Sequence, residues 1–256
     1  MALLQYHVLV FRNQMLTREQ QGQFAENYGE LESHVGRLRN GKRYSVINDI
    51  TNIQPDGKKI PKLVNRGPNH WHTDKSYHEI PSAITMLHGK QVPSKGGETL
   101  FTNMRLAYEA LSSDMKARVD GLKVVHSWEA NRKNVGETPA TEAQKRERPP
   151  VTHPLVNHHP QTGHPALYLD PTTAAGIKGW SNTQSKALLD ELVTHATQTD
   201  FIYTHEWQIG DVVMWDNGFL MHRRDAFDAA HNRLLKRTTL KLPPDRHIVP
   251  PGNPVT

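Results

Sequence analysis

Two residues in this chain, His72 and Asp74, have the types and spacing of a metal-binding pair. In an extended segment both side chains leave the backbone on the same face, so they could bind one ion together. The spacing alone is weak evidence, because 16 histidines and 13 aspartates give about one such triplet by chance. A second histidine, His222, follows a turn and a strand pattern far along the chain. Two histidines and one carboxylate would form the facial triad that leaves three positions open on non-haem Fe(II).

Two arginines, Arg233 and Arg237, follow His222. If this stretch is a returning strand, their even separation places both side chains on one face. A fixed guanidinium near a metal suits bidentate capture of a carboxylate, such as one on a dicarboxylic co-substrate.

The composition limits the chemistry further. The 256 residues include no cysteine, which excludes disulfides, zinc–thiolate sites, iron–sulfur clusters and thiol nucleophiles. The net charge of +5 is spread along the chain, which favours small anionic molecules over nucleic acid as partners. No apolar run approaches the ~20 residues of a membrane span, and the N-terminus lacks the features of a signal peptide. We therefore expect no membrane partner and a cytoplasmic location.

Short strands dominate the expected elements. Hydrophobic patterns predict strands near residues 8–11 (as a buried strand), 44–47, 83–87, 122–128, 166–169, 201–203, 211–215 and 237–240. Capping signals predict helices from Thr17 to about Tyr28, at 104–111, at 113–120 and at 181–196. Residues 131–150 contain almost no large apolar side chain and predict a mobile loop or lid. No linker divides the chain, so we expect one domain over residues 1–256, mainly β with peripheral helices, as a sandwich or jelly roll.

Four segments in order carry a family resemblance: Trp71–Asp74, Val92–Leu100, Ala107–Leu111 and His222–Arg233. With them the chain resembles the Fe(II)- and 2-oxoglutarate-dependent dioxygenases of the taurine dioxygenase and phenoxyacetate herbicide dioxygenase type, the TauD/TfdA family. The resemblance extends from about residue 9 to residue 240. It implies a double-stranded β-helix, which is a distorted jelly roll.

By position, the resemblance assigns His72, Asp74 and His222 as the iron ligands. It assigns Thr99 and Arg233 to the distal carboxylate of 2-oxoglutarate. With O₂, the implied reaction hydroxylates a substrate and releases succinate and CO₂. Where the hydroxylated carbon also bears a sulfonate, ether oxygen or amine, the product can then fragment.

For the substrate side, the resemblance matches Arg237 to an arginine that meets the anionic group of the substrate. Tyr77 stands where the family usually has phenylalanine. Taurine itself is disfavoured, because Pro68 replaces an asparagine of the taurine-specific enzymes and Lys75 replaces a small apolar residue. Lys75 could add a second positive contact, and Asn48 is a further candidate. We therefore expect a small carboxylate or sulfonate as substrate, and a homo-oligomer, because relatives are often dimers or tetramers.

Two other interpretations stay open at this point. His70, His72 and Asp74 have the H-x-H-x-D spacing of zinc-dependent hydrolases, although Lys75 stands where those enzymes continue with histidine. A non-catalytic metal-binding β-sandwich protein is the second alternative. Succinate release or O₂ uptake that depends on Fe(II) and 2-oxoglutarate separates both from a dioxygenase.

The remaining candidate residues have simpler interpretations. We expect His153, His158, His159 and His164 to be exposed turn residues, and His126 and Trp128 to share one strand face in the core. Asp216 and Asn217, just before His222, are expected to support the site rather than to bind metal.

Overall fold

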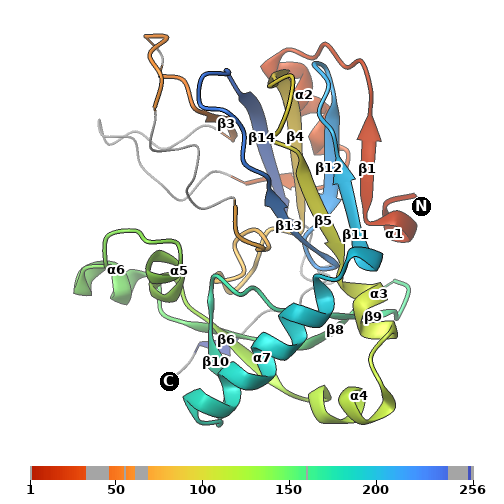
Figure 1. Ribbon diagram of the computed structural model, residues 1–256, viewed down its shortest axis with the longest axis vertical. Coiled ribbons are helices and arrows are strands. Elements are labelled where there is room, and N and C mark those ends of the chain that lie inside the picture. Colours follow the sequence, from red (N-terminus) through yellow and green to blue (C-terminus); the bar gives the residue numbers. More distant parts are fainter. Residues whose placement is uncertain are drawn as a thin grey trace.

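A six-stranded antiparallel sheet forms one side of the molecule (Figure 1). The computed structural model describes residues 2–32, 46–54, 56–60, 69–159, 161–241 and 253–254. The strand order is β1-β12-β4-β14-β2, and β3 also pairs with the long strand β14. The strands are β1 (Val8–Phe11), β2 (Glu30–Leu31), β3 (Ile47–Thr51), β4 (Ile84–Gln91), β12 (Val212–Asp216) and β14 (Leu234–Lys241).

Three smaller antiparallel sheets complete the β structure. The one that matters for the site has the order β11-β5-β13, with β11 (Ile202–His205), β5 (Thr99–Asn103) and β13 (Leu220–Arg224). The others are β10-β6-β7-β15 and the pair β8-β9, with bounds β6 (Lys123–His126), β7 (Val151–Pro154), β8 (Val156–His158), β9 (Pro165–Leu167), β10 (Ala174–Ile177) and β15 (Asn253–Pro254). The mainly β prediction is thus confirmed, and the sheets do not close into a barrel.

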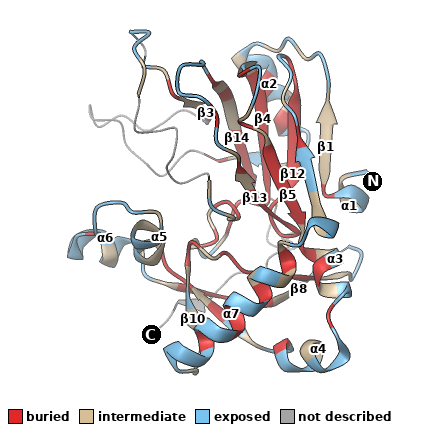
Figure 2. Ribbon diagram, in the orientation of Figure 1, coloured by how far each residue is buried: buried red, intermediate tan, exposed pale blue. Residues whose placement is uncertain are grey.

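The helices lie around these sheets (Figure 1). They are α1 (Ala2–Tyr6), α2 (Arg18–Glu26), α3 (Met104–Glu109), α4 (Ser113–Val119), α5 (Trp128–Asn134), α6 (Glu142–Glu147), α7 (Asn182–Ala196) and the 3₁₀ turn η2 (Thr199–Phe201). The capping boxes predicted at Thr17 and Ser181 are both present. Helix α7 buries one face, including Leu188 and Leu192, against the sheets (Figure 2). No described helix is long and apolar enough to cross a membrane.

A hydrophobic cluster between two sheets positions the strands that lead to His222. Trp215 and Val213 of β12 pack there with Phe101 of β5 and Leu220 of β13. The rings of Phe101 and Trp215 meet edge to face, with centroids 5.2 Å apart. Because this cluster holds β12 against β5 and β13, it sets the position of the turn between Trp215 and His222. Figure 2 shows the buried residues concentrated along these strands.

Several sequence predictions were wrong in detail. Strand β1 is half-buried rather than buried, because it lies at the edge of the sheet and, among the described strands, pairs with β12 alone. Residues 131–150 are not one loop: they contain the end of α5 and all of α6, whose caps are Ser127 and Thr141. Neither helix has a buried residue, which explains the polar composition. The expected strand at 44–47 lies partly outside the described residues.

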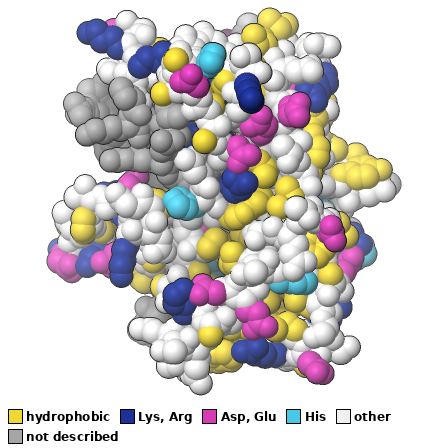
Figure 3. All heavy atoms as spheres, in the orientation of Figure 1, with side chains coloured by type: hydrophobic (Ala, Val, Ile, Leu, Met, Phe, Trp, Pro, Cys, Tyr) yellow, Lys and Arg dark blue, Asp and Glu magenta, His cyan; other side chains and the backbone are white. Residues whose placement is uncertain are grey.

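The histidine interpretations need correction as well. His153 and His159 are buried rather than exposed, and the His153 ring bonds to the backbone carbonyls of Ser76 and His78, each 3.0 Å away. His126 is fully buried as expected, but Trp128 begins α5 and does not share its strand face. The surface carries charges of both signs, interspersed over the face in Figure 3.

Candidate active site

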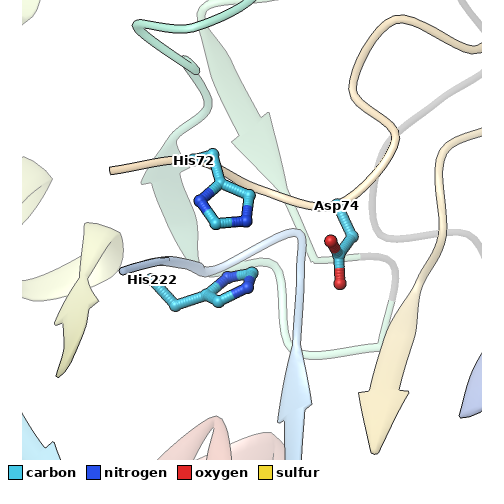
Figure 4. A group of neighbouring side chains, drawn as sticks. All are labelled: His72, Asp74 and His222. Atoms are coloured by element: carbon cyan, nitrogen blue, oxygen red, sulfur yellow. The ribbon is translucent and has the colours of Figure 1, made fainter. Parts of the chain in front are cut away.

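His72 and His222 are joined through their backbones. The His72 N–H donates to the His222 carbonyl at 3.0 Å, and the His222 N–H donates back at 2.8 Å. This bridge attaches the loop that carries His72 to β13 and places the two rings 4.2 Å apart at their centroids. With Asp74 they form a group whose ligand atoms all lie within 4.8 Å of one another. Figure 4 shows the three side chains directed toward one another.

The protonation states of this group suit a metal. Burial and the charge of His72 lower the pKa of His222 to about 3, so that its ring is neutral at physiological pH. Its Nδ1 atom is buried and has no hydrogen-bond partner among the described residues. The Nδ1 atom of His72 lies 2.8 Å from the His70 carbonyl, which fixes the tautomer that leaves Nε2 free for a metal. The donor set therefore fits a divalent transition metal.

Asp74 is held as a carboxylate. Burial alone would raise its pKa, but the charges of His222 and Arg237 and a hydrogen bond from Thr85 keep the pKa of Asp74 well below its usual range. The Thr85 hydroxyl donates to Oδ2 at 2.6 Å. One carboxylate oxygen, Oδ1, lies 3.7 Å from a guanidinium nitrogen of Arg237.

Asn217 holds the segment that carries His72 and Asp74 in place through several hydrogen bonds. Its side-chain oxygen accepts from the Asp74 N–H at 3.4 Å and from the Trp215 indole at 2.9 Å. Its amide donates to Thr85 Oγ1 at 2.9 Å, and its carbonyl accepts from the Thr73 hydroxyl. The supporting position expected for Asn217 therefore matches its contacts.

Sequence reasoning missed Asp170, which supports the same segment from the other side. Its Oδ2 accepts from the Thr73 N–H at 3.3 Å and from the Ser76 hydroxyl at 2.9 Å. Its Oδ1 accepts from the N–H and the hydroxyl of Thr172. Burial raises the pKa of Asp170, while His72 and these hydrogen bonds oppose that rise. No local pattern around Asp170 indicated this contact.

A small cavity next to the triad contains the residues expected to hold the co-substrate. Thr99 and Arg233 line it together with His72, Asp74 and His222. Arg233 is 3% exposed, and it donates to the Gly97 carbonyl at 3.2 Å. Burial lowers the pKa of Arg233 to about 9, so the side chain keeps its charge at neutral pH. Described residues form no ion pair with it within 4 Å, which leaves the cation available for an anionic ligand.

A second cavity, of about 220 Å³, also adjoins the triad. Lys75 and Tyr77 line it, and Arg237 lines both cavities. The Arg237 Nε atom is buried without a hydrogen-bond partner among the described residues. Lys75, by contrast, pairs with Glu32 at 3.1 Å, so much of its charge is already neutralised. Asn48 lies directly opposite Arg237 in the pairing of β3 with β14, and its buried side-chain oxygen also lacks a described partner.

The chain matches the family model described as taurine catabolism dioxygenase TauD, TfdA family, over residues 1–239. The chain belongs to this family. It is 38% identical over 240 residues to the alpha-ketoglutarate-dependent 2,4-dichlorophenoxyacetate dioxygenase of Cupriavidus pinatubonensis, covering 91% of this chain and 83% of that one. It is 34% identical to the (S)-phenoxypropionate/alpha-ketoglutarate-dioxygenase of Sphingobium herbicidovorans, covering 91% and 82%. A solved structure of AAD-2 in complex with Mn(II) and N-oxalylglycine shares 36% identity and a TM-score of 0.83, covering 94% and 85%.

Family membership settles the fold and the class of reaction. The architecture is the jelly roll of the TauD/TfdA dioxygenases, as predicted. The protein is a 2-oxoglutarate-dependent non-haem iron dioxygenase that uses Fe(II), 2-oxoglutarate and O₂. Its substrate is a small molecule. The zinc hydrolase is not favoured, and His70 does not belong to the described metal-binding group.

Proposed function

We propose that this enzyme hydroxylates a small organic anion bearing a carboxylate or sulfonate, and that Arg237 binds the anionic group. Two of the relatives are named for 2,4-dichlorophenoxyacetate and (S)-phenoxypropionate, and these names identify carboxylates. The observation that carries the proposal is the position of Arg237, which lines the 220 Å³ cavity 3.7 Å from Asp74. An anion bound to this guanidinium would lie next to the triad, which is where C–H oxidation takes place.

In this proposal His72, Asp74 and His222 hold the iron, and Thr99 and Arg233 hold the distal carboxylate of 2-oxoglutarate. The bound iron supplies the redox chemistry, and the protein supplies ligation, orientation and exclusion of water. Thr85 and Asn217 keep the carboxylate and its backbone in place, and the buried, neutral His222 needs no deprotonation before it binds metal. Tyr77, Lys75 and Asn48 stay candidates for substrate contacts. A cytoplasmic location and a homo-oligomeric state stay predictions.

A test of the substrate class uses pairs in which the anionic group at one end is replaced by a neutral hydroxyl-bearing group. Phenoxyacetate with phenoxyethanol, and butanesulfonate with butanol, are incubated with Fe(II) and 2-oxoglutarate while succinate release and O₂ uptake are measured. We expect turnover of the anions and little turnover of the alcohols. Arg237→Gln should raise KM for the preferred anion about tenfold or more, because a charge-assisted pair is lost. Arg118→Gln, at an exposed ion pair with Glu191, is the control. Equal turnover of both members of each pair would contradict the proposal.

The ligand set has its own test. His72→Ala and Asp74→Ala should each abolish turnover and weaken Mn(II) binding, measured by titration of the metal-free protein. Wild-type activity in either variant would remove these residues from the site.

A further inference from the structure

A second arginine, Arg224, is brought to the co-substrate cavity by the pairing of two strands. In the antiparallel pair β13–β5, Arg224 lies directly opposite Thr99, and His222 lies opposite Phe101. Residues directly opposite each other project their side chains on the same face of a sheet, and so do residues two apart on one strand. Arg224 therefore shares a face with both His222 and Thr99, and it lines the same cavity as Arg233.

The two arginines form one buried positive wall. Arg224 is 8% exposed and Arg233 is 3% exposed. Their guanidinium carbons lie 5.0 and 5.9 Å from the centroid of the Phe227 ring. Burial is the main cause of the lowered pKa of Arg233, and the charge of Arg224 is the second. The two cations therefore lie near each other. The charge of Glu98 opposes this lowering, and a bound dianion would further reduce the repulsion between the two buried cations.

Arg224 also contacts the loop that leads to the first candidate ligand. Its Nη2 donates to Asn69 Oδ1 at 2.8 Å, three residues before His72. A guanidinium has five N–H donors in a fixed fork, so one side chain can serve this amide and a carboxylate together. The contact raises a structural alternative, in which Arg224 acts only by supporting the loop, and the experiment must separate the two.

We propose that Arg224 is a second guanidinium for the distal carboxylate of 2-oxoglutarate, acting beside Thr99 and Arg233. The cavity then recognises a dicarboxylate with two cations, which selects 2-oxoglutarate over 2-oxo acids that lack the second carboxylate. This inference concerns the co-substrate and does not depend on which prime substrate the enzyme uses.

The test compares two ligands that differ in that carboxylate alone. Binding of 2-oxoglutarate and of 2-oxopentanoate to the Mn(II)-loaded enzyme is measured by calorimetry without O₂. Arg224→Gln should weaken 2-oxoglutarate binding about tenfold or more, as expected for a lost charge-assisted pair. It should change the affinity for 2-oxopentanoate less than about twofold, because that ligand has no group for Arg224 to bind.

Asn69→Ala is the control for support of the loop, since it removes the amide partner and leaves the arginine in place. We expect this variant to keep the affinity for 2-oxoglutarate. If Arg224→Gln does not fold, as judged by thermal unfolding, Arg224→Lys keeps the charge and the aliphatic stem. It should show a smaller loss that is still confined to 2-oxoglutarate. Equal losses for both ligands, the same loss in Asn69→Ala, or unchanged 2-oxoglutarate binding in the arginine variants would each overturn the proposal.

Discussion

Gly97 lies in a tight turn whose backbone packs against the side chain of Arg233. Its φ of +77° lies in the left-handed region, which favours glycine. A Cβ at this position would lie 3.3 Å from Arg233 Nε and 3.3 Å from a ring carbon of Pro93. The Gly97 carbonyl accepts a hydrogen bond from the same arginine. The Gly-Gly turn before β5 therefore sets the position of the guanidinium as well as the direction of the strand.

Gly97→Ala should therefore affect both folding and co-substrate binding. We expect the free energy of unfolding to fall by about 1–3 kcal/mol, because alanine is strained at this φ. We also expect weaker 2-oxoglutarate binding to the Mn(II)-loaded enzyme, because the added methyl group displaces Arg233. Gly121→Ala is the matched control: its φ is +68°, and a Cβ there meets no atom within 4 Å. If both variants lose stability and both keep the affinity for 2-oxoglutarate, Gly97 does not position Arg233 for binding.

For the secondary-structure elements, the sequence predicted features formed by residues close together in the chain, such as helix caps. It did not predict contacts between residues far apart in the chain. The cap of α7 was predictable because Ser181 and Gln184 are three residues apart and satisfy each other's backbone. The candidate metal-binding pair could be proposed for a similar reason, since His72 and Asp74 are two residues apart, but it needed His222 from a distant strand to carry weight. Asp170 was not predictable, because its bond to the Thr73 N–H joins residues 97 positions apart and leaves no periodic trace. The pairing of β5 with β13, which aligns Arg224 with Thr99, is also non-local.

Helices α5 and α6 were also missed in the sequence. Their capping residues are present, but neither helix has the buried apolar face by which a helix is usually recognised. Asn131 of α5 lines the 220 Å³ cavity next to the triad and donates to Thr172 Oγ1 at 2.8 Å. Lys145 of α6 pairs with Glu129 at 2.7 Å. Neither helix has a buried residue. The Lys145–Glu129 pair joins α6 to α5, and hydrogen bonds such as those from Asn131 and Asn134 to Thr172 attach α5 to the rest of the fold.

We expect residues 128–147 to open more readily than α7, which has five buried residues. Segments with few buried apolar contacts open locally at low free-energy cost. Hydrogen exchange followed by mass spectrometry should show their amides exchanging about tenfold faster, or more, than those of α7. Asn131→Ala should widen the difference, while α7 in the same sample is the control. Equal protection of both segments would contradict a mobile lid.

For the whole molecule, the abundance of histidine has a thermodynamic consequence. Seven described histidines are at most 8% exposed: His7, His88, His126, His153, His159, His205 and His222. Burial lowers the pKa of His205 to about 4, although the nearby Asp211 carboxylate opposes the shift. Burial and the charge of Lys75 likewise lower the pKa of His78 to about 4. The rings of His205 and His78 therefore stay neutral in the folded enzyme at pH values where the unfolded chain would protonate them.

The metal-free enzyme should therefore lose stability between pH 6.5 and about 4. Above pH 6.5 neither state binds a proton at these rings, and below it the unfolded state binds more, so acid favours unfolding. Each such histidine contributes about 1.4 kcal/mol per pH unit in this window.

Urea unfolding from pH 4 to pH 8 at constant ionic strength measures the slope. His205→Gln should flatten it, whereas the exposed His158→Gln should not. The depressed pKa of Asp74 acts in the same direction but only below pH 4, outside this window. A free energy of unfolding that stays constant from pH 6.5 to pH 4 would contradict a folded state that keeps these histidines neutral.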